Sequence, residues 1–351
     1  MNLKYKNTFF KIFDWEYWPS LLFYIPNIPY ALYLAYKAKK LTFFTAANPS
    51  IKSSGNGAES KFKTLQLIPK KIRPKSILVK PNMNFNTITE QLENACISFP
   101  VIAKPDIGFR GLLVKKIKNH KKLKIYLEKY KIDIIIQEFI NLQHECGIFH
   151  IKNPEKNKGI ITSITLKKFL SVKGDGSTKL KKLIIKHKRA KRYIDEIHQS
   201  YFSEFEKIPQ KGELVILSAI GNHSRGTRFI NGNHLINKAL NDRLDKISAS
   251  INGWYYGRLD IKYNSLEELE RGENFKILEI NGIIAEPTHI YDSENSSYLK
   301  ALREIRYHWK KLYTISIINH RILKIPYKNT KEFFSEILVL KNYISTIKNT
   351  I

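Results

Sequence analysis

Two short stretches in the last third of the chain carry polar side chains at a spacing that suits metal and phosphate binding. Both alternate polar with apolar residues, which predicts half-buried strands over residues 257–263 and 275–282. Side chains two residues apart share one strand face, and this applies to two pairs, Arg258 with Asp260 and Glu279 with Asn281. If the strands pair, two carboxylates, an amide and a guanidinium meet on one surface. Such a set suits Mg²⁺ carrying a polyphosphate, because Mg²⁺ prefers oxygen ligands.

The elements around these strands predict an α+β protein. Apolar runs bounded by turn residues predict strands at residues 77–79, 99–105, 112–117, 132–140, 146–151, 160–166, 214–219 and 227–230. Amphipathic stretches predict helices at residues 88–95, 123–130 and 240–251, and a mainly helical chain from residue 298 onward. A further helix is expected after a tight turn at residues 174–176, capped by Ser177 or Thr178. Strands and helices do not alternate regularly, which favours α+β over a repeated βαβ arrangement.

Length, charge and cysteine content limit the classes of function. At 351 residues the chain is expected to form two or three lobes. Its formal net charge of +29 fits either an anionic partner (nucleotide, nucleic acid or acidic lipid) or a composition rich in Lys, Ile and Asn throughout. Cys96 and Cys146 do not make a disulfide framework, and the N-terminus does not show the pattern of a secretory signal. We therefore expect a cytoplasmic protein in a reducing compartment.

The first 40 residues are rich in aromatic side chains and end in lysines. Trp, Tyr and Phe crowd residues 15–36, and lysines follow at positions 37, 39 and 40. The apolar run at residues 21–36 is short and broken by prolines, which argues against a membrane span. Aromatics flanked by lysines suit contact of residues 1–40 with an anionic membrane surface, peripherally on the inner face of the membrane. Packing of this segment against the protein's own core is the favoured alternative.

Further features follow one another in an order typical of one superfamily. A strand ends at Lys104, a glycine-bearing turn follows at residues 108–111, and a buried strand ends near Glu138, seven residues before Glu145. A basic residue then precedes Gly-Asp-Gly, and the Arg-Leu-Asp and Leu-Glu-Ile-Asn strands close the set. Over roughly residues 96–300 this order resembles the ATP-grasp superfamily of carboxylate–amine ligases, which includes D-alanine–D-alanine ligase, glutathione synthetase and cyanophycin synthetase. No single feature is specific, and the ordered set carries the resemblance.

The resemblance implies the ATP-grasp fold, in which two α+β lobes clasp ATP. It divides the chain into an aromatic N-terminal segment with a pre-ATP-grasp lobe at residues 1–95, a first ATP-grasp lobe at 96–170, a second lobe with the metal site at 171–300, and a C-terminal helical extension at 301–351. Relatives usually carry an N-terminal α/β lobe that binds the first substrate, but residues 1–95 do not show regular βα units. The N-terminal segment is therefore atypical, and the sequence does not identify the substrate.

The resemblance also implies which residues hold the nucleotide. Lys104 and Lys167 would bind the ATP phosphates, with Lys168 as the alternative to Lys167. The loop over the phosphates would contain Gly108, Arg110 and Gly111. The hinge that binds adenine would be formed by Glu138, Phe139 and Ile140, and Glu145 would accept from the ribose hydroxyls.

Metal binding and catalysis are implied in the same way. Asp260, Glu279 and Asn281 would hold Mg²⁺, or Mn²⁺ in its place, with Glu279 bridging two ions. Arg258 would stabilise charge on the transferring phosphoryl group or on the tetrahedral intermediate, so Arg258 and Lys104 are the expected catalytic residues. Beyond the metal strand, Glu286, Thr288, His289 and Tyr291 lie where substrates should approach. Among the polar residues 221–227, His223 and Arg225 are candidates for contact with an anionic group of the substrate, and a plain turn is the alternative.

The implied reaction is ATP-dependent amide-bond formation. Phosphorylation turns a carboxylate into an acyl phosphate with a good leaving group, and an amine then displaces phosphate. The expected partners are small-molecule or peptide carboxylates and amines, with a homodimer as an option. Two alternatives stay open: a small-molecule kinase of the same fold, and a non-enzymatic basic protein that binds a membrane surface or nucleic acid. The absence of aromatic-interleaved RNA-binding signatures argues against nucleic acid.

Overall fold

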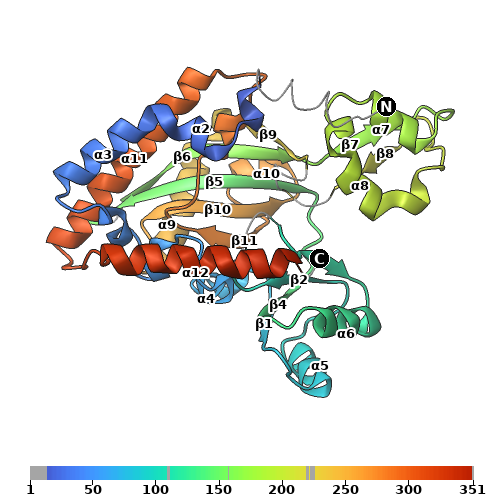
Figure 1. Cartoon of the computed structure of the whole chain (residues 1–351), viewed down its shortest axis with the longest axis horizontal. Coiled ribbons are helices and arrows are strands. Elements are labelled where there is room, and N and C mark those ends of the chain that lie inside the picture. Colours follow the sequence, from blue (N-terminus) through green and yellow to red (C-terminus); the bar gives the residue numbers. More distant parts are fainter. Residues whose placement is uncertain (1–13, 109–110, 157, 219–220, 222–225, 350–351) are drawn as a thin grey trace.

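The architecture is built on two antiparallel sheets, as the α+β prediction requires (Figure 1). The structure is a computed structural model of the whole chain, and it describes residues 14–108, 111–156, 158–218, 221 and 226–349. A five-stranded sheet forms the centre of the molecule, a four-stranded sheet lies beside it, and a small two-stranded ribbon carries its own helices. Arg110, His223 and Arg225, which the sequence singled out, lie outside the described residues.

The five-stranded sheet has the strand order β11-β10-β5-β6-β9 and contains the two polar strands. Its strands are β5 (His144–Asn153), β6 (Lys158–Lys168), β9 (Arg228–Asn231), β10 (Tyr256–Tyr263) and β11 (Phe275–Asn281). One face packs on α9 (Lys238–Ser250) and α4 (Lys61–Gln66) through side chains such as Ile148, Leu259 and Leu244. This apolar face fixes the register, so the polar residues of the same strands must point to the opposite face.

A register shift in β11 turns its carboxylate toward that polar face. Asp260 pairs with Glu279, whereas the next residue of β10, Ile261, pairs with Ile277. Leu278 is therefore an extra residue in β11, which is a β-bulge. Bulges reverse the side-chain alternation and are common beside active sites. Here the bulge leaves Ile277 in the apolar core while Glu279 points the other way.

The four-stranded sheet forms a separate lobe with the order β1-β4-β2-β3. Its elements are β1 (Ser76–Val79), α5 (Phe85–Asn94), β2 (Val101–Pro105), β3 (Lys115–Ile117), α6 (His120–Lys129) and β4 (Ile134–Glu138). Side chains of α5 and α6 pack on the sheet to form its core. The strand predicted at residues 112–117 is shorter in the structure, because Gly111 and Leu113 have positive φ angles that interrupt an extended chain.

The two-stranded ribbon belongs to a third, smaller unit. It pairs β7 (Ser171–Lys173) with β8 (Leu214–Ile216) and carries α7 (Leu180–Lys186) and α8 (Ile194–Tyr201). The predicted cap of α7 is wrong: its N-cap is Lys179, without a side-chain bond. Ser177 and Thr178 instead donate their backbone N–H groups to Asp175, so they complete the preceding turn.

Segments from both ends of the chain cover one side of the large sheet (Figure 1). They contain α2 (Ser20–Tyr24), α3 (Ile28–Lys37), the 3₁₀ turns η3 (Phe43–Ala46) and η10 (Thr288–Tyr291), and the long helices α11 (Tyr298–Arg321) and α12 (Thr330–Asn349). The aromatic N-terminal residues pack as the favoured alternative predicted: Phe23 is buried against Ile290 and Ile305. Among the described helices, none combines the length and apolar character that a membrane crossing needs.

Candidate active site

Strands β10 and β11 bring the four predicted side chains together. Asp260 lies directly opposite Glu279 in the register, and Arg258 lies opposite Asn281. The Asn281 amide donates to Asp260 Oδ2 at 2.9 Å. Arg258 donates from Nε and Nη2 to the two oxygens of Asp260, at 3.2 Å each. The bidentate pair fixes the plane of the guanidinium beside the carboxylate.

Lys167 extends the cluster onto strand β6. Its ammonium donates to Glu145 Oε1 at 2.6 Å and to Asp260 Oδ1 at 2.9 Å. Glu145 and Lys167 are also direct partners in the β5–β6 register. The neighbouring Lys168 is exposed, because successive residues of a strand point to opposite faces. Of the two lysines that the sequence left open, Lys167 is therefore the one inside the cluster.

Two more lysines reach the cluster from outside the large sheet. Lys61 begins α4, whose N-cap Ser60 accepts from the Lys63 N–H, and the Lys61 ammonium donates to Glu279 Oε1. Lys104 comes from β2 of the small sheet and lies close enough for Glu279 to act on its charge. The sequence analysis did not assign Lys61 to the site. The feature of the sequence that could have indicated Lys61 is its position at the start of a helix, after a glycine-bearing loop.

The cluster contains four cations and three carboxylates, namely Lys61, Lys104, Lys167 and Arg258 with Glu145, Asp260 and Glu279. Burial raises the pKa of Asp260, but Arg258 and Lys167 outweigh that effect and hold the pKa well below its usual range. Burial likewise raises the pKa of Glu279, and Lys61 and Lys104 bring it below its ordinary value. Burial lowers the pKa of Lys104, against the opposing effect of Glu279. Glu59 is a further carboxylate that acts on Lys61 and Glu279. With Lys104 protonated, four cations converge among these carboxylates, which suits an anionic ligand bound together with a metal ion.

Gly147 provides the space in which Arg258 lies. It is the partner of Asp260 in the β5–β10 register. A Cβ atom at Gly147 would lie 2.8 Å from Arg258 Cδ, so any other residue would push the arginine stem away from the strand. No pattern in the sequence distinguishes this glycine. Its role follows only from the pairing of β5 with β10.

The predicted hinge residues lie where the small lobe joins the large sheet. The Lys75 N–H donates to Glu138 Oε2 at 3.1 Å, which ties the end of β4 to the start of β1. Lys262 Nζ donates to the Ile140 carbonyl at 3.2 Å, and Lys116 Nζ lies 3.5 Å from the centre of the Phe139 ring. Glu138, Phe139 and Ile140 also line a hollow of about 680 Å³. In the described chain, the lining of this hollow does not include the lysines and carboxylates of the cluster.

The predicted phosphate loop is described only in part. Gly108 follows β2, and Gly111 adopts a positive φ of 73° before β3. These two glycines therefore connect the strand that contains Lys104 to the edge of the small sheet. Arg110 lies between them, outside the described residues. On the other side of the cluster, Gly221 lies beside the Glu145 carboxylate.

A second polar group lies next to Arg258, beyond the end of β11. Arg258 Nη1 donates to the Glu286 carbonyl at 3.3 Å. The Glu286 carboxylate accepts from the hydroxyls of Tyr291, at 2.9 Å, and Tyr24. Tyr24 belongs to the aromatic N-terminal segment, and the sequence analysis did not connect it to the site. Nearby, burial lowers the pKa of His289 to about 4, so its imidazole is neutral at pH 7.

The donor set fits a hard divalent cation bound together with phosphate. Asp260 and Glu279 supply carboxylate oxygens, and Asn281 supplies an amide oxygen from the same strand pair. In the described part of the chain, no group of three or more His, Cys, Asp or Glu side chains gathers in a metal-binding arrangement. Mg²⁺ commonly takes only one or two protein carboxylates and completes its coordination with water and phosphate oxygens. The residues present are therefore compatible with Mg²⁺ held jointly with a nucleotide.

The chain is similar in part to known proteins. Residues 58–154 match the family model of the RimK-like ATP-grasp domain. Similar solved structures include a bifunctional glutathione synthetase from Pasteurella multocida (16% identity, TM-score 0.40, covering 72% of this chain and 36% of that one). Another is the VanG D-Ala:D-Ser ligase from Enterococcus faecalis (13% identity, TM-score 0.42, covering 76% of this chain and 63% of that one). A third is the D-alanine–D-alanine ligase from Bacillus anthracis (15% identity, TM-score 0.39, covering 76% of this chain and 68% of that one).

The chain spans between about a third and two thirds of the length of these solved structures. A search of the curated proteins found no match. The family match begins three residues before Lys61 and ends with β5, so it includes the whole small sheet and Glu145. That match and the two antiparallel sheets agree with the resemblance seen in the sequence: the chain has the ATP-grasp α+β fold.

Proposed function

We propose that the protein is an ATP-dependent ligase that activates a carboxylate as an acyl phosphate and joins it to an amine, releasing ADP and phosphate. The observation that carries this proposal is the convergence of Lys61, Lys104, Lys167 and Arg258 on the Asp260–Glu279 pair. These cations come from α4, from the small sheet and from two strands of the large sheet. A polyphosphate bound there would hold the two lobes together. The match to a RimK-like ATP-grasp domain supports the same reaction class.

The proposed nucleotide site runs from the hinge to the cluster. Adenine would lie at Glu138, Phe139 and Ile140, and the ribose near Glu145. Lys104, Lys167 and the loop containing Gly108, Arg110 and Gly111 would bind phosphate oxygens. We add Lys61 to the proposed phosphate-binding residues because its ammonium donates a hydrogen bond to Glu279. The four cations of the cluster favour binding of a trianionic or tetraanionic group.

Asp260, Glu279 and Asn281 would hold Mg²⁺, or Mn²⁺, with the phosphates. When bound, the ion neutralises negative charge on the transferring phosphoryl group. Arg258 contributes a fixed cation beside the same oxygens, because two hydrogen bonds to Asp260 hold its guanidinium in place. The protein needs no nucleophilic side chain, since the substrate carboxylate itself attacks the γ-phosphorus.

The second step of the reaction, attack of the amine on the acyl phosphate, would involve the groups beyond β11. The amine must lose a proton to attack the acyl phosphate. Glu286, held by two tyrosine hydroxyls, would attract the substrate ammonium before that proton leaves. Water must be excluded because it would hydrolyse the acyl phosphate. The Tyr24 side chain, which packs against Phe23 and Trp309 and donates its hydroxyl to Glu286, would help to exclude water there.

Release of ADP and phosphate tests this proposal. The full-length protein would be incubated with ATP, Mg²⁺ and panels of carboxylates and amines, and ADP, free phosphate and joined product would be measured separately. Stoichiometric ADP, phosphate and amide support the ligase. ADP with a phosphorylated product and no free phosphate would identify the kinase alternative instead. Glu279→Gln should abolish turnover, whereas Glu273→Gln, which alters an exposed ion pair with Arg271, should not.

Peripheral contact with an anionic membrane is a second candidate role, and it rests on the exposed apolar face of α2 and α3. Leu21 is 71% exposed and Tyr36 82% exposed, and Leu22, Ile25 and Tyr33 are exposed as well. Lysines 37 and 39 follow them at the surface. Sedimentation with vesicles containing phosphatidylglycerol should capture the protein, and Leu21→Asn with Leu22→Asn should weaken the capture. Leu214→Asn, an equally exposed leucine in the third unit, is the control.

A further inference from the structure

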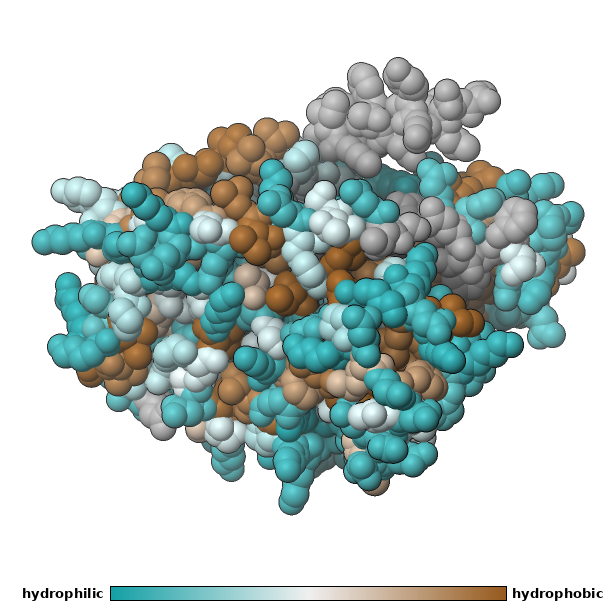
Figure 2. All heavy atoms as spheres, turned by 60° about the horizontal axis from the view of Figure 1, so that its bottom comes forward, coloured by the Kyte–Doolittle hydropathy of each residue, from teal (hydrophilic) through white to brown (hydrophobic). Residues whose placement is uncertain are grey.

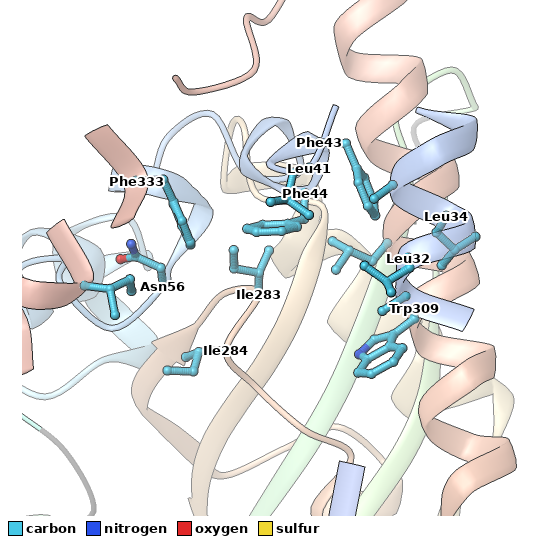
Figure 3. Close-up of a pocket in the computed structure, with 14 residues that line it drawn as sticks. Leu32, Leu34, Leu41, Phe43, Phe44, Asn56, Ile283, Ile284, Trp309 and Phe333 are labelled. Carbon is cyan, nitrogen blue, oxygen red and sulfur yellow. The ribbon is translucent and has the colours of Figure 1, made fainter. Parts of the chain in front are cut away.

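An apolar pocket of about 360 Å³ lies between the two terminal segments and the end of the large sheet. It is lined by side chains from α3, η3, α11, α12 and residues 283–284 (Figure 3). Asn56 is the one lining residue that is neither aliphatic nor aromatic. In Figure 3, Asn56 and Phe333 lie at one end, while Leu32, Leu34 and Trp309 lie at the other. The pocket is therefore elongated, apolar along its length and polar at one end.

The wall of this pocket is continuous with the candidate active site. Ile283 and Ile284 come directly after β11, and their N–H groups donate to the Ser54 and Gly55 carbonyls at 2.9 and 3.0 Å. Gly282 makes this pairing close, since a Cβ there would lie 2.0 Å from the Ser54 carbonyl oxygen. Asn281, two residues before Ile283, belongs to the cluster. A molecule in the pocket thus lies against the same strand end that carries the proposed metal ligand.

The pocket opens to solvent through apolar side chains. Leu32, Leu41 and Ile284 line it and are 57%, 46% and 41% exposed. Figure 2 shows apolar residues gathered between hydrophilic ones on one face of the molecule. Apolar groups that line an empty cavity lack van der Waals contacts on one side, and water does not bind favourably there. An apolar ligand that enters the cavity gains these contacts. Leu32, Leu41 and Ile284 form the exposed lip of the pocket, through which such a ligand can enter.

The polar end of the pocket is positively charged. Asn56 Nδ2 donates to Glu336 Oε2 at 3.4 Å. The Glu336 carboxylate also meets two lysines, Lys328 at 2.5 Å and Lys52 at 3.4 Å. Two ammonium groups against one carboxylate leave a positive charge beside Asn56. An anionic head group is therefore the complement of this end.

We propose that this pocket binds the alkyl chain of an amphiphile whose anionic head group lies at the Asn56 end. At about 30 Å³ for each small group, the volume suits a chain of roughly eight to twelve carbons. The lining residues lie outside the matched residues 58–154, and all except Ile283 and Ile284 lie outside the ATP-grasp lobes expected at residues 96–300. Binding requires neither ATP nor a metal. Refuting the proposed ligase reaction would therefore not refute this proposal, and the reverse also holds.

Calorimetric titration of the full-length protein with hexanoate, octanoate, decanoate and dodecanoate, below their micellar concentrations, tests the proposal. Affinity should rise about fourfold for each added methylene until the chain fills the pocket. Dodecylammonium should bind more weakly than dodecanoate, because its head group meets Lys52 and Lys328. Ala35→Trp fills the pocket and should remove binding. Leu32→Asn, at the exposed lip, should weaken binding at little risk to folding, and Leu299→Trp, at a 65% exposed position outside the lining, is the matched control.

A second measurement distinguishes a membrane lipid from a soluble amphiphile as the source of the alkyl chain. Vesicles of phosphatidylglycerol with a fluorescent acyl chain are mixed with the protein, and transfer of the chain is followed. Transfer that Ala35→Trp removes identifies a membrane lipid as the source, and binding of free carboxylates without transfer identifies a soluble amphiphile. The proposal is overturned if no carboxylate binds saturably, if affinity does not depend on chain length, or if Ala35→Trp binds as well as the unmodified protein.

Discussion

Replacing Glu279 by Gln tests whether this carboxylate is a metal ligand. The substitution removes the negative charge that faces Lys61 and Lys104 and keeps the size of the side chain. The Lys61 and Glu279 side chains are 23% and 24% exposed. The pair therefore lies between a surface ion pair, worth about 0–1 kcal/mol, and a buried pair, whose disruption costs about 3–5 kcal/mol. We expect the free energy of unfolding to fall by about 1–3 kcal/mol.

The decisive assay is the stabilisation by a non-hydrolysable ATP analogue, measured by thermal unfolding with Mg²⁺ and with EDTA. At 100 times its Kd, the analogue should stabilise the unmodified protein by about 2.7 kcal/mol when Mg²⁺ is present, and by less in EDTA. Glu279→Gln removes one negative charge from the cluster and keeps all of its cations. The variant should therefore gain at least as much stability from the analogue in EDTA as the unmodified protein does, and Mg²⁺ should add nothing.

Glu273→Gln is the matched control for this experiment. Glu273 pairs with Arg271 at 2.9 Å, and both side chains are more than half exposed, so its loss should change stability by no more than about 1 kcal/mol. Mg²⁺-dependent stabilisation should be unchanged in this variant. If Glu279→Gln kept the Mg²⁺-dependent increase, Glu279 would not be a metal ligand. If the analogue stabilised neither form, the proposed nucleotide site itself would be refuted.

Three further predictions concern other residues of the site and its surroundings. Gly147→Ala should displace Arg258 and lower kcat for phosphate release by about tenfold, with unfolding in urea nearly unchanged, because its Cβ would meet a flexible side chain. His308 is buried and its pKa is lowered to about 4, so it stabilises the fold above its unfolded pKa of about 6.5. That stability, up to about 3 kcal/mol, should be lost as pH falls from about 6.5 to 4. His308→Gln should make the pH dependence of the urea midpoint shallower, and the part that remains belongs to His150 and His289, whose pKa values burial also lowers. Tyr24→Phe removes a hydroxyl bound to Glu286 and should raise KM for one substrate by about tenfold while kcat changes little; an equal fall in kcat would assign Tyr24 a different role.

The strand pattern was enough to predict much of the fold and which site residues share a face. Strands β4, β5, β6, β10 and β11 lie within a few residues of their predicted positions. Period-two alternation predicts which neighbours share a face within one strand, and Arg258 with Asp260 follows that rule. Apolar side chains on the other face then hold the register in the large sheet. Local periodicity therefore sufficed where the partners lie on one strand or on adjacent strands.

Contacts between distant segments could not be predicted in this way. Lys61 and Glu279 are 218 residues apart, and Tyr24 and Glu286 are 262 apart. A lysine in the first turn of a helix has no local feature that indicates its partner. The cap of α7 failed for the same reason. The Leu180 and Lys181 N–H groups, which such a cap would bind, donate to the Lys207 and Phe205 carbonyls, and the Thr178 hydroxyl donates to Asp175.

A single residue in β11 decides whether the site can form at all. Phe275, Ile277, Glu279 and Asn281 are all odd-numbered, so strict alternation would place the two apolar and the two polar side chains on one face. The apolar pair is buried in the core beside Ile280, and an unbroken strand would carry Glu279 into that core as well. The bulge at Leu278 shifts the alternation by one residue, after Ile277 and before Glu279. The sequence correctly predicted that Glu279 and Asn281 share a face, but the residue that turns this face toward Asp260, Lys61 and Lys104 is an ordinary leucine whose role depends on its pairing with β10.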